Sequence, residues 1–503
     1  MKSLYQLLDK IPCSWNGKGE LRTQIGGVHS DSRKVKRGDL FVAVSGFHID
    51  GHSFIKEALK RGAMGVVSER FDPVAATAEI PQFKVSNSRA VLSQLVASAF
   101  DFPARKLRCI GITGTNGKTT TAFLIQYLLN IVSRAGLIST IYYDDGAIKE
   151  PAETTTPSPE VLNEAFARMV ANRVSYCVME VSSHALDQNR TEGIPFSSAV
   201  FTNLTQDHLD YHHDFDAYYQ AKQKLFFSAD PPKNSIINSD NAYGIRLIKE
   251  CSKDRRVISY GIDAPCDYRA QAVRLSLKEL HFDLIRKANR LTVTAPLLLR
   301  HNVYNILAAL SVFCEEGFDL NDVLQHLSHF PGVPGRLERI EEGQDFSVFV
   351  DYAHTPDGLK NVLSSVQGFP RSRVISVFGC GGDRDRYKRP IMGEIVNSFS
   401  DIVILTSDNP RTERAEDILA EIKKGIDAKK GKLFVIVDRR EAIRQAIELA
   451  EANDLVFIFG KGHETYQILG NDKIPFSDQE IARYYLKEKC SPSAKSQKLV
   501  VEN

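Results

Sequence analysis

The chain has 503 residues, of which 43% are hydrophobic and 25% charged, a composition typical of folded globular proteins. Its 64 basic and 62 acidic residues leave a net charge of +2, which gives no reason to expect nucleic acid or an anionic membrane as partner. No apolar run approaches membrane-spanning length, and charges at Lys2, Asp9 and Lys10 argue against a signal peptide. Eight cysteines stand singly, which favours a reducing cytoplasm and argues against structural zinc.

A phosphate-binding loop is predicted at residues 111–121. An apolar run at 107–112 predicts a buried strand, Gly114 and Gly117 follow, and apolar residues at helical spacing begin at residue 123. In this arrangement backbone N–H groups, the helix N-terminus and the Lys118 charge all favour phosphate, and the Thr119 hydroxyl can bind Mg²⁺. The usual pattern has its first glycine where this chain has Ile112, so a glycine-rich turn without a ligand is the alternative.

Residues 1–106 are predicted to form a small α/β domain. Apolar runs at 41–44 and 65–67 predict strands, and residues 54–61 have a short helical pattern. Polar clusters at 29–33 and 46–52 are typical of capped surface loops, and the Ser-Asp-Ser-Arg sequence of the first could also bind an anionic ligand.

Residues 107–333 are predicted to form the central domain around the phosphate loop. A strand at 174–179 ends in Glu180, whose carboxylate is placed to hold Mg²⁺, although a solvent-facing glutamate is the alternative. Four acids and three histidines between residues 207 and 216 suggest a Mg²⁺ or Mn²⁺ shell rather than zinc, with a capped loop as the alternative. Taken alone, Lys222 reads as a solvated lysine, and Asn302 and Asn305 as helix caps.

Residues 334–490 alternate strands and helices. Apolar runs at 348–350, 374–378, 402–405, 433–437 and 455–459 predict strands buried on both faces of a parallel sheet, with helices at 390–399, 415–424 and 441–452. Five of these strands carry polar residues at their carboxyl ends, where open α/β sheets bind ligands. The predicted fold class is therefore α/β with three domains: a small N-terminal α/β domain, a central P-loop domain with a mostly parallel sheet, and a C-terminal Rossmann-like domain. Residues 491–503 are predicted to be a disordered tail.

Several long motifs occur in a characteristic order. They are the phosphate loop at 113–120, Glu-Val-Ser-Ser-His at 180–184, Asn203 with Asp-His at 207–208, Asp-Tyr-Ala-His at 351–354 and Gly-Lys-Gly-His-Glu at 460–464. From about residue 28 to residue 480 the chain resembles the Mur ligases of peptidoglycan synthesis. Within that family it is most similar to the enzymes that add the third residue of the peptide.

The resemblance implies a reaction and its components. ATP would phosphorylate the D-glutamyl carboxylate of UDP-N-acetylmuramoyl-L-alanyl-D-glutamate, and the amine of meso-diaminopimelate would attack the acyl phosphate to form an amide. Mg²⁺ would balance the phosphate charge. The family also implies a carbamate derived from CO₂ on Lys222, small-molecule partners without nucleic acid or membrane, a monomer, and a place in the cytoplasm.

The resemblance also implies positions for ATP and metal. ATP would bind Gly114, Thr115, Asn116, Gly117, Lys118, Thr119, Thr120, Asn302, Arg336 and Asp351. The metal ligands would be Thr119, Glu180, His208 and Lys222 as its carbamate, and the catalytic residues would be Lys118, Lys222, His208 and Glu180.

The remaining implied contacts belong to the two other substrates. The UDP-sugar-peptide would meet Ser30, Ser32, Phe47, His48, Ile49, Thr154, Thr155, Thr156, Ser182, Gln188 and Arg190. The acceptor would meet Arg384, Asp408, Asn409, Pro410, Arg411, Gly460 and Glu464. Within this set, the Arg411 guanidinium can grip the carboxylate that diaminopimelate has and lysine lacks, and Glu464 suits an ammonium group.

Three alternatives remain open at this stage. The same ligase could use L-lysine, or the chain could be a ligase like folylpolyglutamate synthase, against which the N-terminal Ser-Asp-Ser-Arg domain and the residues at 408–411 argue. A nucleotide-dependent switch that hydrolyses ATP without joining anything is the third, and the ligand-binding edge predicted in the C-terminal sheet argues against it.

Overall fold

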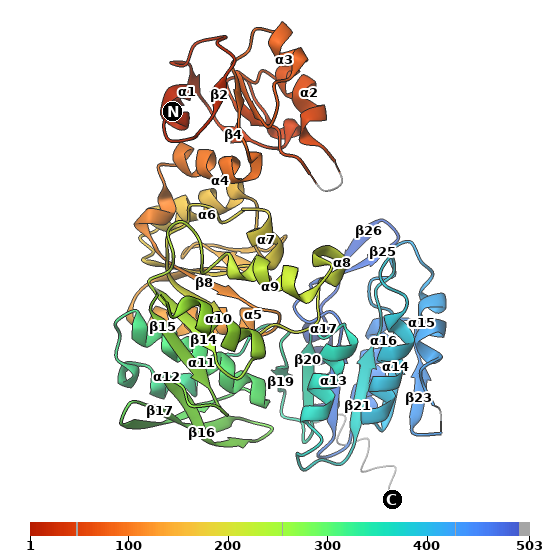
Figure 1. Cartoon of the computed structure of the whole chain (residues 1–503). Helices are drawn as coiled ribbons and strands as arrows, with labels where there is room; N and C mark the ends of the chain where they lie inside the picture. The colour runs from red at the N-terminus through yellow and green to blue at the C-terminus, as the bar shows by residue number, and fades with distance from the viewer. Residues whose placement is uncertain (47–48, 254, 428, 492–503) are drawn as a thin grey trace, which may run out of the picture. The chain divides into compact units, whose positions relative to one another are not determined.

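The computed structural model describes residues 1–46, 49–253, 255–427 and 429–491 (Figure 1). The predicted UDP-sugar contacts Phe47 and His48, and all of the predicted tail except Ser491, lie outside the described residues. No helix in the described part of the chain is both long and apolar enough to span a bilayer.

The N-terminal region contains a five-stranded sheet with helices on both faces. Its order is β2 (Ser14–Trp15), β7 (Gln82–Lys84), β6 (Gly65–Ser68), β5 (Leu40–Val42) and β4 (Val28–His29), with only β2 antiparallel to its neighbour. Alternate side chains of a strand point to opposite faces. Leu40 and Val42 therefore pack under α1 (Leu4–Leu8) and α4 (Ser88–Ala99), whereas Phe41 packs under α2 (Ile55–Lys60) and α3 (Pro73–Thr77).

The central sheet has eleven strands and is parallel in its middle. The parallel part is β9 (Ala135–Ile138), β12 (Tyr176–Glu180), β8 (Arg108–Thr113), β13 (Phe196–Phe201), β14 (Asn234–Asn238) and β15 (Val257–Gly261), and the next strand, β16 (Tyr268–Leu275), is also parallel to β15. β10 (Tyr142–Asp144) and β11 (Lys149–Pro151) extend one edge, and β16, β17 (Leu280–Arg286) and β18 (Asn289–Ala295) extend the other. β8, which leads into the phosphate loop, therefore lies between β12 and β13.

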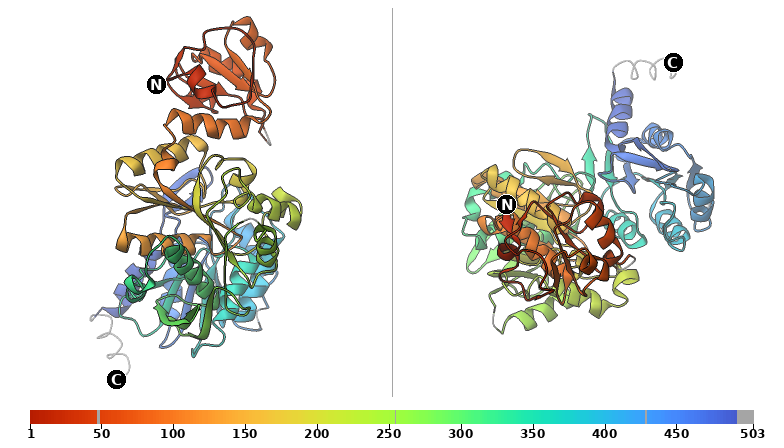
Figure 2. Two further views of the ribbon diagram at one scale, coloured as in Figure 1. Left: turned by 60° about the vertical axis from the view of Figure 1, so that its left-hand side comes forward. Right: turned by 90° about the horizontal axis from the view of Figure 1, so that it is seen from above.

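Helices cover both faces of this sheet. α6 (Pro159–Ala171), α9 (Phe215–Gln223) and α10 (Ala242–Cys251) share one buried cluster with residues of β8, β12 and β13. α5 (Lys118–Val132) contacts β8, β9 and β12, and α11 (Arg300–Glu315) is buried along most of its length. Figure 2 shows α6 lying beside α4, so the N-terminal and central regions pack together through these two helices.

The C-terminal sheet has six strands in the order β19, β20, β24, β21, β22, β23, and only β19 is antiparallel. Their bounds are β19 Glu338–Ile340, β20 Ser347–Asp351, β24 Leu455–Phe459, β21 Val374–Phe378, β22 Ile402–Leu405 and β23 Lys432–Val435. α13 (Pro356–Ser365), α14 (Lys388–Phe399) and α15 (Ala415–Lys423) cover one face, while α16 (Arg439–Leu449) and α17 (Asp478–Cys490) cover the other. The hairpin β25 (Tyr466–Leu469) and β26 (Asp472–Pro475) precedes α17.

The predicted α/β fold class is confirmed, and so are the five parallel strands of the C-terminal sheet. β23 differs from the prediction of burial on both faces: its ends are exposed because it is an edge strand with one neighbour. Asn302 and Asn305 are not exposed caps, because both are buried inside the first turns of α11.

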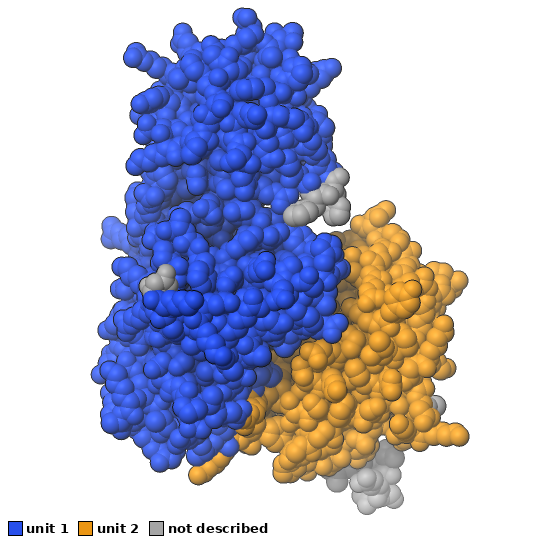
Figure 3. Space-filling model, viewed as in Figure 1, with its two compact units in different colours: residues 1–273, 282–294, 301–328 blue, residues 274–281, 295–300, 329–503 orange. Residues whose placement is uncertain are grey.

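The chain divides into two compact units (Figure 3). Unit 1 comprises residues 1–273, 282–294 and 301–328, and unit 2 comprises residues 274–281, 295–300 and 329–503. The N-terminal and central sheets belong to unit 1, and the C-terminal sheet belongs to unit 2. Each unit is described below by itself.

Candidate active site

The phosphate loop joins the end of β8 to the start of α5 in unit 1. Gly114 has φ +148° and Gly117 has φ +87°, values that residues with a side chain rarely adopt. A Cβ at Gly114 would lie 1.9 Å from Thr202 Oγ1, and one at Gly117 would lie 2.4 Å from Asn305 Oδ1. Both glycines are therefore needed for the backbone to pass so close to its neighbours. Thr115 is buried, Thr120 lies in the first turn of α5, and Asn116 is held by its N–H bond to Asn203 Oδ1 at 2.9 Å.

Two lysines converge on one carbonyl of this loop. Lys118 Nζ donates to Gly114 O and Thr115 O, each at 2.9 Å, and Lys222 Nζ donates to Gly114 O at 2.8 Å. Lys222 is 1% exposed and lies over the Tyr218 ring, and it forms no ion pair with any described residue. Burial, reinforced by the Lys118 charge, holds the pKa of Lys222 well below its usual value. Taken alone, Lys222 reads as a solvated lysine, and its burial shows that reading to be wrong, whereas the role that the family resemblance implies for it stays a prediction.

Glu180 lies at the carboxyl end of β12 and faces the loop. Its Oε2 accepts a hydrogen bond from Thr119 Oγ1 at 3.0 Å, and its Oε1 accepts from Thr140 N at 2.9 Å and Thr140 Oγ1 at 3.2 Å. Glu180 is fully buried, so the alternative of a solvent-facing glutamate is wrong. Among the described residues its carboxylate contacts only neutral donors. A buried carboxylate beside a hydroxyl, with no cation paired to it, fits a divalent cation.

The acids between residues 207 and 216 do not gather into a metal site. Asp214 caps α9 by accepting from Ala217 N at 2.7 Å, and Asp216 pairs with Arg246 at 2.6 Å. Nowhere in the described ranges do three or more His, Cys, Asp or Glu side chains gather closely enough to hold a metal ion. The predicted Mg²⁺ or Mn²⁺ shell is therefore wrong as a cluster, and Asp214 and Asp216 serve instead as a helix cap and an ion-pair partner.

His184 of α7 (Ser183–Asp187), His212 of α8 (Leu209–His212) and His208, the residue before α8, form a group beside the loop. The ring centroid of His184 lies 4.8 Å from that of His208 and 5.6 Å from that of His212. Burial and the two neighbouring histidines lower the pKa of His184 to about 4, so this ring stays neutral at neutral pH. His208 is half-exposed and adopts φ +52°, a conformation unusual for a side-chain-bearing residue.

The Asn302–Asn305 pair reaches the phosphate loop from α11. Thr121 Oγ1 donates to Asn305 Oδ1 at 3.2 Å, and Asn305 Nδ2 donates to Asn302 Oδ1 at 2.8 Å. Because Asn305 also lies against Gly117, the structure brings Asn302 within two contacts of the loop.

A cavity of about 840 Å³ lies between the N-terminal and central regions of unit 1. Five predicted UDP-sugar-peptide residues line it, namely Ser30, Ser32, Ile49, Gln188 and Arg190. Arg33, Arg61 and Arg89 also line it. Arg33 pairs with Asp31 and Arg61 pairs with Glu57, so among the described lining residues Arg89 and Arg190 give the cavity an excess of positive charge suited to an anionic ligand. Ser30 is engaged with the protein itself, since its N and Oγ donate to Glu160 Oε1 at 3.2 and 2.7 Å.

The hydroxyl-rich residues connect this cavity to Glu180. Thr156 Oγ1 donates to Glu180 O at 2.8 Å and accepts from Ser182 N at 3.0 Å, and Arg190 Nη1 donates to Thr156 O at 2.7 Å. Arg190 in turn holds Gln188 Oε1 at 2.7 Å. Thr155 Oγ1 accepts from Thr140 Oγ1 at 3.1 Å, whereas the Thr154 side chain is exposed. The structure therefore brings Thr155, Thr156, Ser182, Gln188 and Arg190 into one network.

Unit 2 holds Arg336 and Asp351. Asp351 is buried at the end of β20, accepts from Leu337 N at 2.7 Å and Ala353 N at 2.8 Å, and has its pKa raised by burial. The Arg336 guanidinium lies 4.7 Å from the centre of the Tyr352 ring. A cation and an aromatic ring therefore lie together near a buried carboxyl, a combination suited to a nucleotide.

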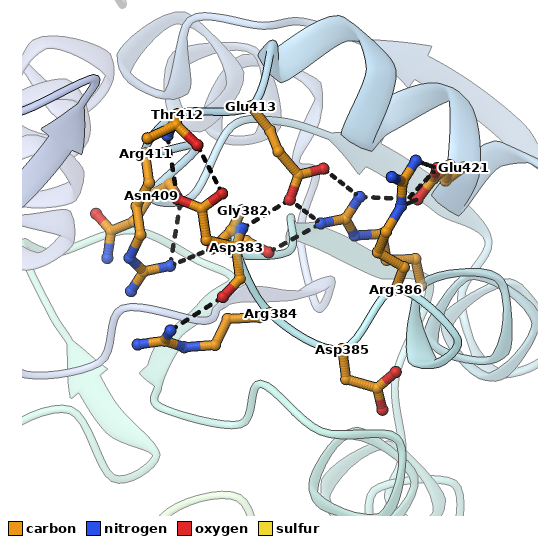
Figure 4. A network of polar contacts seen from close by, with 12 residues as sticks. Gly382, Asp383, Arg384, Asp385, Arg386, Asn409, Arg411, Thr412, Glu413 and Glu421 are labelled. Atoms are coloured by element: carbon orange, nitrogen blue, oxygen red, sulfur yellow. Dashed lines mark hydrogen bonds and ion pairs between the residues drawn. The ribbon is translucent and has the colours of Figure 1, made fainter. Parts of the chain in front are cut away.

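The predicted acceptor residues gather at the carboxyl ends of β21, β22 and β24. Figure 4 shows that Arg384 and Arg411 each direct their guanidinium group to a carbonyl of the same turn. Arg384 Nη1 donates to Asp383 O at 3.0 Å and Arg411 Nη1 donates to Gly382 O at 2.7 Å. In the part of unit 2 that the structure describes, neither guanidinium pairs with a carboxylate, so both are available to an acidic ligand.

Asp408, Asn409 and Pro410 form the buried floor of this region. Asn409 Nδ2 donates to Glu464 Oε2 at 3.1 Å, and its Oδ1 accepts from Lys461 Nζ at 3.0 Å. Lys461 is fully buried and also pairs with Glu464 Oε2 at 3.0 Å. Gly460 has φ +113°, and a Cβ there would lie 2.6 Å from Asp408 Oδ2. The floor therefore carries more carboxylate than ammonium.

Sequence reasoning missed several residues that hold these groups. Thr140 and Tyr218 gave no signal, because single polar residues in apolar segments are common. Lys461 stands within the Gly-Lys-Gly-His-Glu motif without an assigned role. Arg389 and Glu413 follow the predicted clusters closely in sequence, and their pairing depends on tertiary contacts that spacing does not encode.

Comparison with known proteins gives a consistent result along the whole chain. Residues 24–100 match the Mur ligase family catalytic domain, residues 112–313 the Mur ligase middle domain, and residues 335–462 the Mur ligase glutamate ligase domain.

Individual relatives agree. The chain is 41% identical over 473 residues to the UDP-N-acetylmuramoyl-L-alanyl-D-glutamate–2,6-diaminopimelate ligase of Clostridium botulinum, covering 93% of this chain and 96% of the relative. It is 44% identical over 469 residues to the ligase of the same name from Gloeobacter violaceus, covering 93% and 95%. A solved structure of a UDP-N-acetylmuramoyl-L-alanyl-D-glutamate–2,6-diaminopimelate ligase aligns with TM-score 0.71 and 34% identity over 98% of this chain and 100% of that one.

With three matching domains and more than 40% identity over nearly its full length, the chain belongs to the Mur ligase family.

Proposed function

We propose that this Mur ligase uses ATP to join meso-diaminopimelate to the D-glutamyl carboxyl of UDP-N-acetylmuramoyl-L-alanyl-D-glutamate. The two guanidinium groups of Arg384 and Arg411, both without a carboxylate partner in the described chain, carry the proposal. They stand beside a floor rich in carboxylate at Asp408 and Glu464. Diaminopimelate presents both a carboxylate and an ammonium group at its far end, and this pair of surfaces complements both. The names of the relatives point to the same acceptor.

The reaction requires a better leaving group than the oxygen of a carboxylate. In the proposed first step the D-glutamyl carboxylate attacks the γ-phosphorus of ATP, and ADP leaves. The acceptor amine then attacks the acyl carbon, and phosphate leaves with the bonding electron pair while the amine loses a proton. The backbone N–H groups of residues 114–120 and the Lys118 ammonium would stabilise the charge on the phosphates. In the same scheme Asn302, Arg336 and Asp351 bind the nucleoside.

Thr119 and Glu180 are the residues that we expect to hold Mg²⁺. Their oxygens lie 3.0 Å apart, and Glu180 is a fully buried carboxylate whose described partners are all neutral. This hard oxygen donor set fits the cation. Once bound, Mg²⁺ would neutralise charge on the phosphates. Thr140 would keep the Glu180 carboxylate oriented, and His208 would contribute to a second cation.

Lys222 fits a carbamate formed with CO₂. Burial lowers the pKa of Lys222 and so favours its neutral amine. The neutral amine is the form that attacks the carbon of CO₂ and then loses a proton. The reaction would replace a buried amine that has no carboxylate partner among the described residues by an anion that can face a metal ion. The present Lys222 Nζ contact with Gly114 O keeps the side chain directed at the phosphate loop.

The UDP-linked substrate is proposed to occupy the cavity of unit 1. Ser32 and the arginines of its wall would meet the UDP end, together with Ser30, Phe47, His48 and Ile49. Thr154, Thr155, Thr156, Ser182, Gln188 and Arg190 would guide the peptide toward Glu180. We assign residues 1–106 to the UDP-sugar, 107–333 to ATP and 334–490 to the acceptor. We further infer a monomer acting in the cytoplasm, where a reducing environment keeps its eight free cysteines reduced.

Phosphate release with matched substrate omissions tests the proposal. We expect release only when ATP, the UDP-linked dipeptide and meso-diaminopimelate are all present. Equal release with ATP alone would instead support a nucleotide-dependent switch. A panel of meso-diaminopimelate, its other isomers and L-lysine identifies the acceptor, and faster turnover of L-lysine would contradict the assignment. Activity with a folate and glutamate would support the folylpolyglutamate-synthase-like alternative.

A further inference from the structure

A buried ion network lies behind the two acceptor guanidiniums. Arg389 of α14 has no exposed surface, and it donates from Nη1 to Glu413 Oε2 at 2.9 Å and from Nη2 to Glu413 Oε1 at 2.8 Å. Its Nη1 also donates to Glu421 Oε2 at 2.7 Å. Side-by-side pairing of this kind fixes the geometry of both partners. None of these three residues was assigned to a substrate.

Glu413 also contacts the turn at residues 381–384. Its Oε1 also accepts from Asp383 N at 2.6 Å (Figure 4). The Asp383 carboxylate in turn accepts from Thr412 Oγ1 at 2.7 Å and Thr412 N at 3.2 Å. Two turns far apart in sequence, residues 381–384 and 409–413, are therefore joined by reciprocal contacts.

The joined turns are tightly packed and strained. Asp383 and Arg411 both have φ +53°, and neither is a glycine. A Cβ on Gly382 would lie 1.8 Å from Pro410 O, so no other residue could stand there. Backbone strain of this kind persists only where surrounding contacts hold it, and the Arg389–Glu413 pair supplies such contacts.

The carbonyl groups of this turn orient both guanidiniums. Gly382 O accepts from Arg411 Nη1, and Asp383 O accepts from Arg384 Nη1. A shift of the 381–384 turn would therefore move both cations that we propose to grip the acceptor. We propose that Glu413 and Arg389 are positioning residues that set the affinity and selectivity for an acceptor carrying a carboxylate. This inference rests on the proposed function.

The central variant is Glu413→Gln, which keeps the shape and removes the charge. Steady-state kinetics on the full chain should show a KM for meso-diaminopimelate raised by about 10–100-fold, because small displacements of a binding group have effects of this size. The preference for meso-diaminopimelate over L-lysine should fall by a similar factor. kcat and the KM values for ATP and the UDP-linked dipeptide should stay within about twofold, which a general loosening of the fold would not produce.

Arg386→Gln is the matched control. Arg386 pairs with Glu421 on the exposed side of the same network, and among the described residues it makes no hydrogen bond or ion pair with Asp383 or Glu413, although its charge helps the Arg389 guanidinium to lower the pKa of Glu413. It should therefore leave the acceptor KM within about twofold of the wild-type value.

A second variant guards against misfolding of the first. Thr412→Val removes the exposed hydroxyl that holds Asp383 without disturbing the buried charges, and it should raise the acceptor KM in the same direction by a smaller factor. An unchanged acceptor KM in both variants would overturn the inference, and so would an equal rise in the KM of all three substrates. Failure of the wild-type protein to use meso-diaminopimelate would be a separate result, directed at the proposed function itself.

Discussion

The phosphate-loop region of unit 1 and the acceptor region of unit 2 balance charge in opposite ways. In the first, Lys222 and Glu180 are both buried, and each contacts only neutral groups of the described chain. In the second, Arg389 is buried in contact with both Glu413 and Glu421. Both regions lie at the carboxyl ends of parallel strands, so the backbone arrangement alone does not explain the difference.

The difference in charge pairing indicates what kind of ligand group would complete each region. An isolated buried charge is unfavourable, so the Glu180 carboxylate favours a bound cation, and burial lowers the pKa of the Lys222 amine, which has no carboxylate partner among the described residues. The acceptor region already pairs Arg389 with Glu413 and Glu421, and among its described residues the Arg384 and Arg411 guanidiniums have no carboxylate partner. The first region is thus completed by its ligands, whereas the second is preformed and selects among ligands.

Removal of Lys118 should have the largest effect. In Lys118→Ala the phosphates lose the full positive charge that bridges the loop, and we expect kcat to fall by at least about 10³-fold. Lys149→Ala, which removes an exposed lysine of β11, is the control and should be near wild type. A near-normal kcat for Lys118→Ala would remove the proposed phosphate site, and with it the contrast between the regions.

Lys222→Ala tests whether a modified lysine completes the first region. The variant should lose about 10³-fold in kcat, as expected when a charged group at the reacting phosphates is lost. A short carboxylic acid should restore part of the rate by occupying the space. Carbon-13 NMR of wild-type protein equilibrated with labelled bicarbonate should show a carbamate signal that the variant lacks.

Lys224→Ala is the matched control for Lys222. This lysine follows closely in sequence, but it is exposed and pairs with Asp187 at 2.8 Å. It should retain near-wild-type activity and the carbamate signal. Full activity of Lys222→Ala without added acid would count against the carbamate.

Arg411→Ala tests the selective region. Truncation of one partner of a desolvated charge pair should lower kcat/KM for meso-diaminopimelate by an amount that corresponds to about 2–4 kcal/mol of lost transition-state stabilisation. L-lysine, which has no carboxylate at its far end, should be affected much less. Arg414→Ala removes an exposed arginine nearby and serves as the control. An unchanged KM for meso-diaminopimelate would contradict the assignment of Arg411.

The sequence was informative wherever function depends on local backbone geometry. Gly114 and Gly117 predicted the loop because their conformations are unavailable to other residues, and the apolar runs around residues 374–378 and 455–459 predicted buried parallel strands whose bounds the structure reproduces. Asp408 and Arg411 stood out because they follow a strand directly. These signals all lie within a few neighbouring residues.

Long-range pairing could not be predicted from the residues alone. Lys222 lies on a helix whose pattern is that of a half-exposed surface, and only the fold shows that its amine is buried against Gly114. The acids at 214 and 216 resembled a metal shell, because spacing does not reveal that one caps a helix and the other pairs with Arg246. Arg389 and Glu413 come from different elements, and their contact depends on the packing of α14.

The smallest expected effect is the pH dependence of stability, which tests whether ion pairing at Glu413 holds the acceptor region in its preformed state. The Arg389 guanidinium lowers the pKa of Glu413 from 4.5 to about 2. Folding therefore favours the deprotonated form of Glu413. Its contribution to the stability of the fold is complete above pH 4.5 and is lost as the pH falls toward 2. Glu413→Gln lacks this contribution at every pH. The Tm difference between wild type and variant, followed by calorimetry, should be largest at neutral pH and shrink below pH 4.5.

Glu416→Gln, at an exposed glutamate of α15, is the control for this series and should show a smaller difference throughout. If the difference for Glu413→Gln stayed constant as the pH fell toward 2, ionisation of the Glu413 carboxylate would not be the source of the stabilisation. The acceptor region would then not owe its preformed state to internal ion pairing. The preformed geometry of the acceptor region would then depend on the close backbone packing at Gly382, and the contrast in charge with the phosphate-loop region would not explain it.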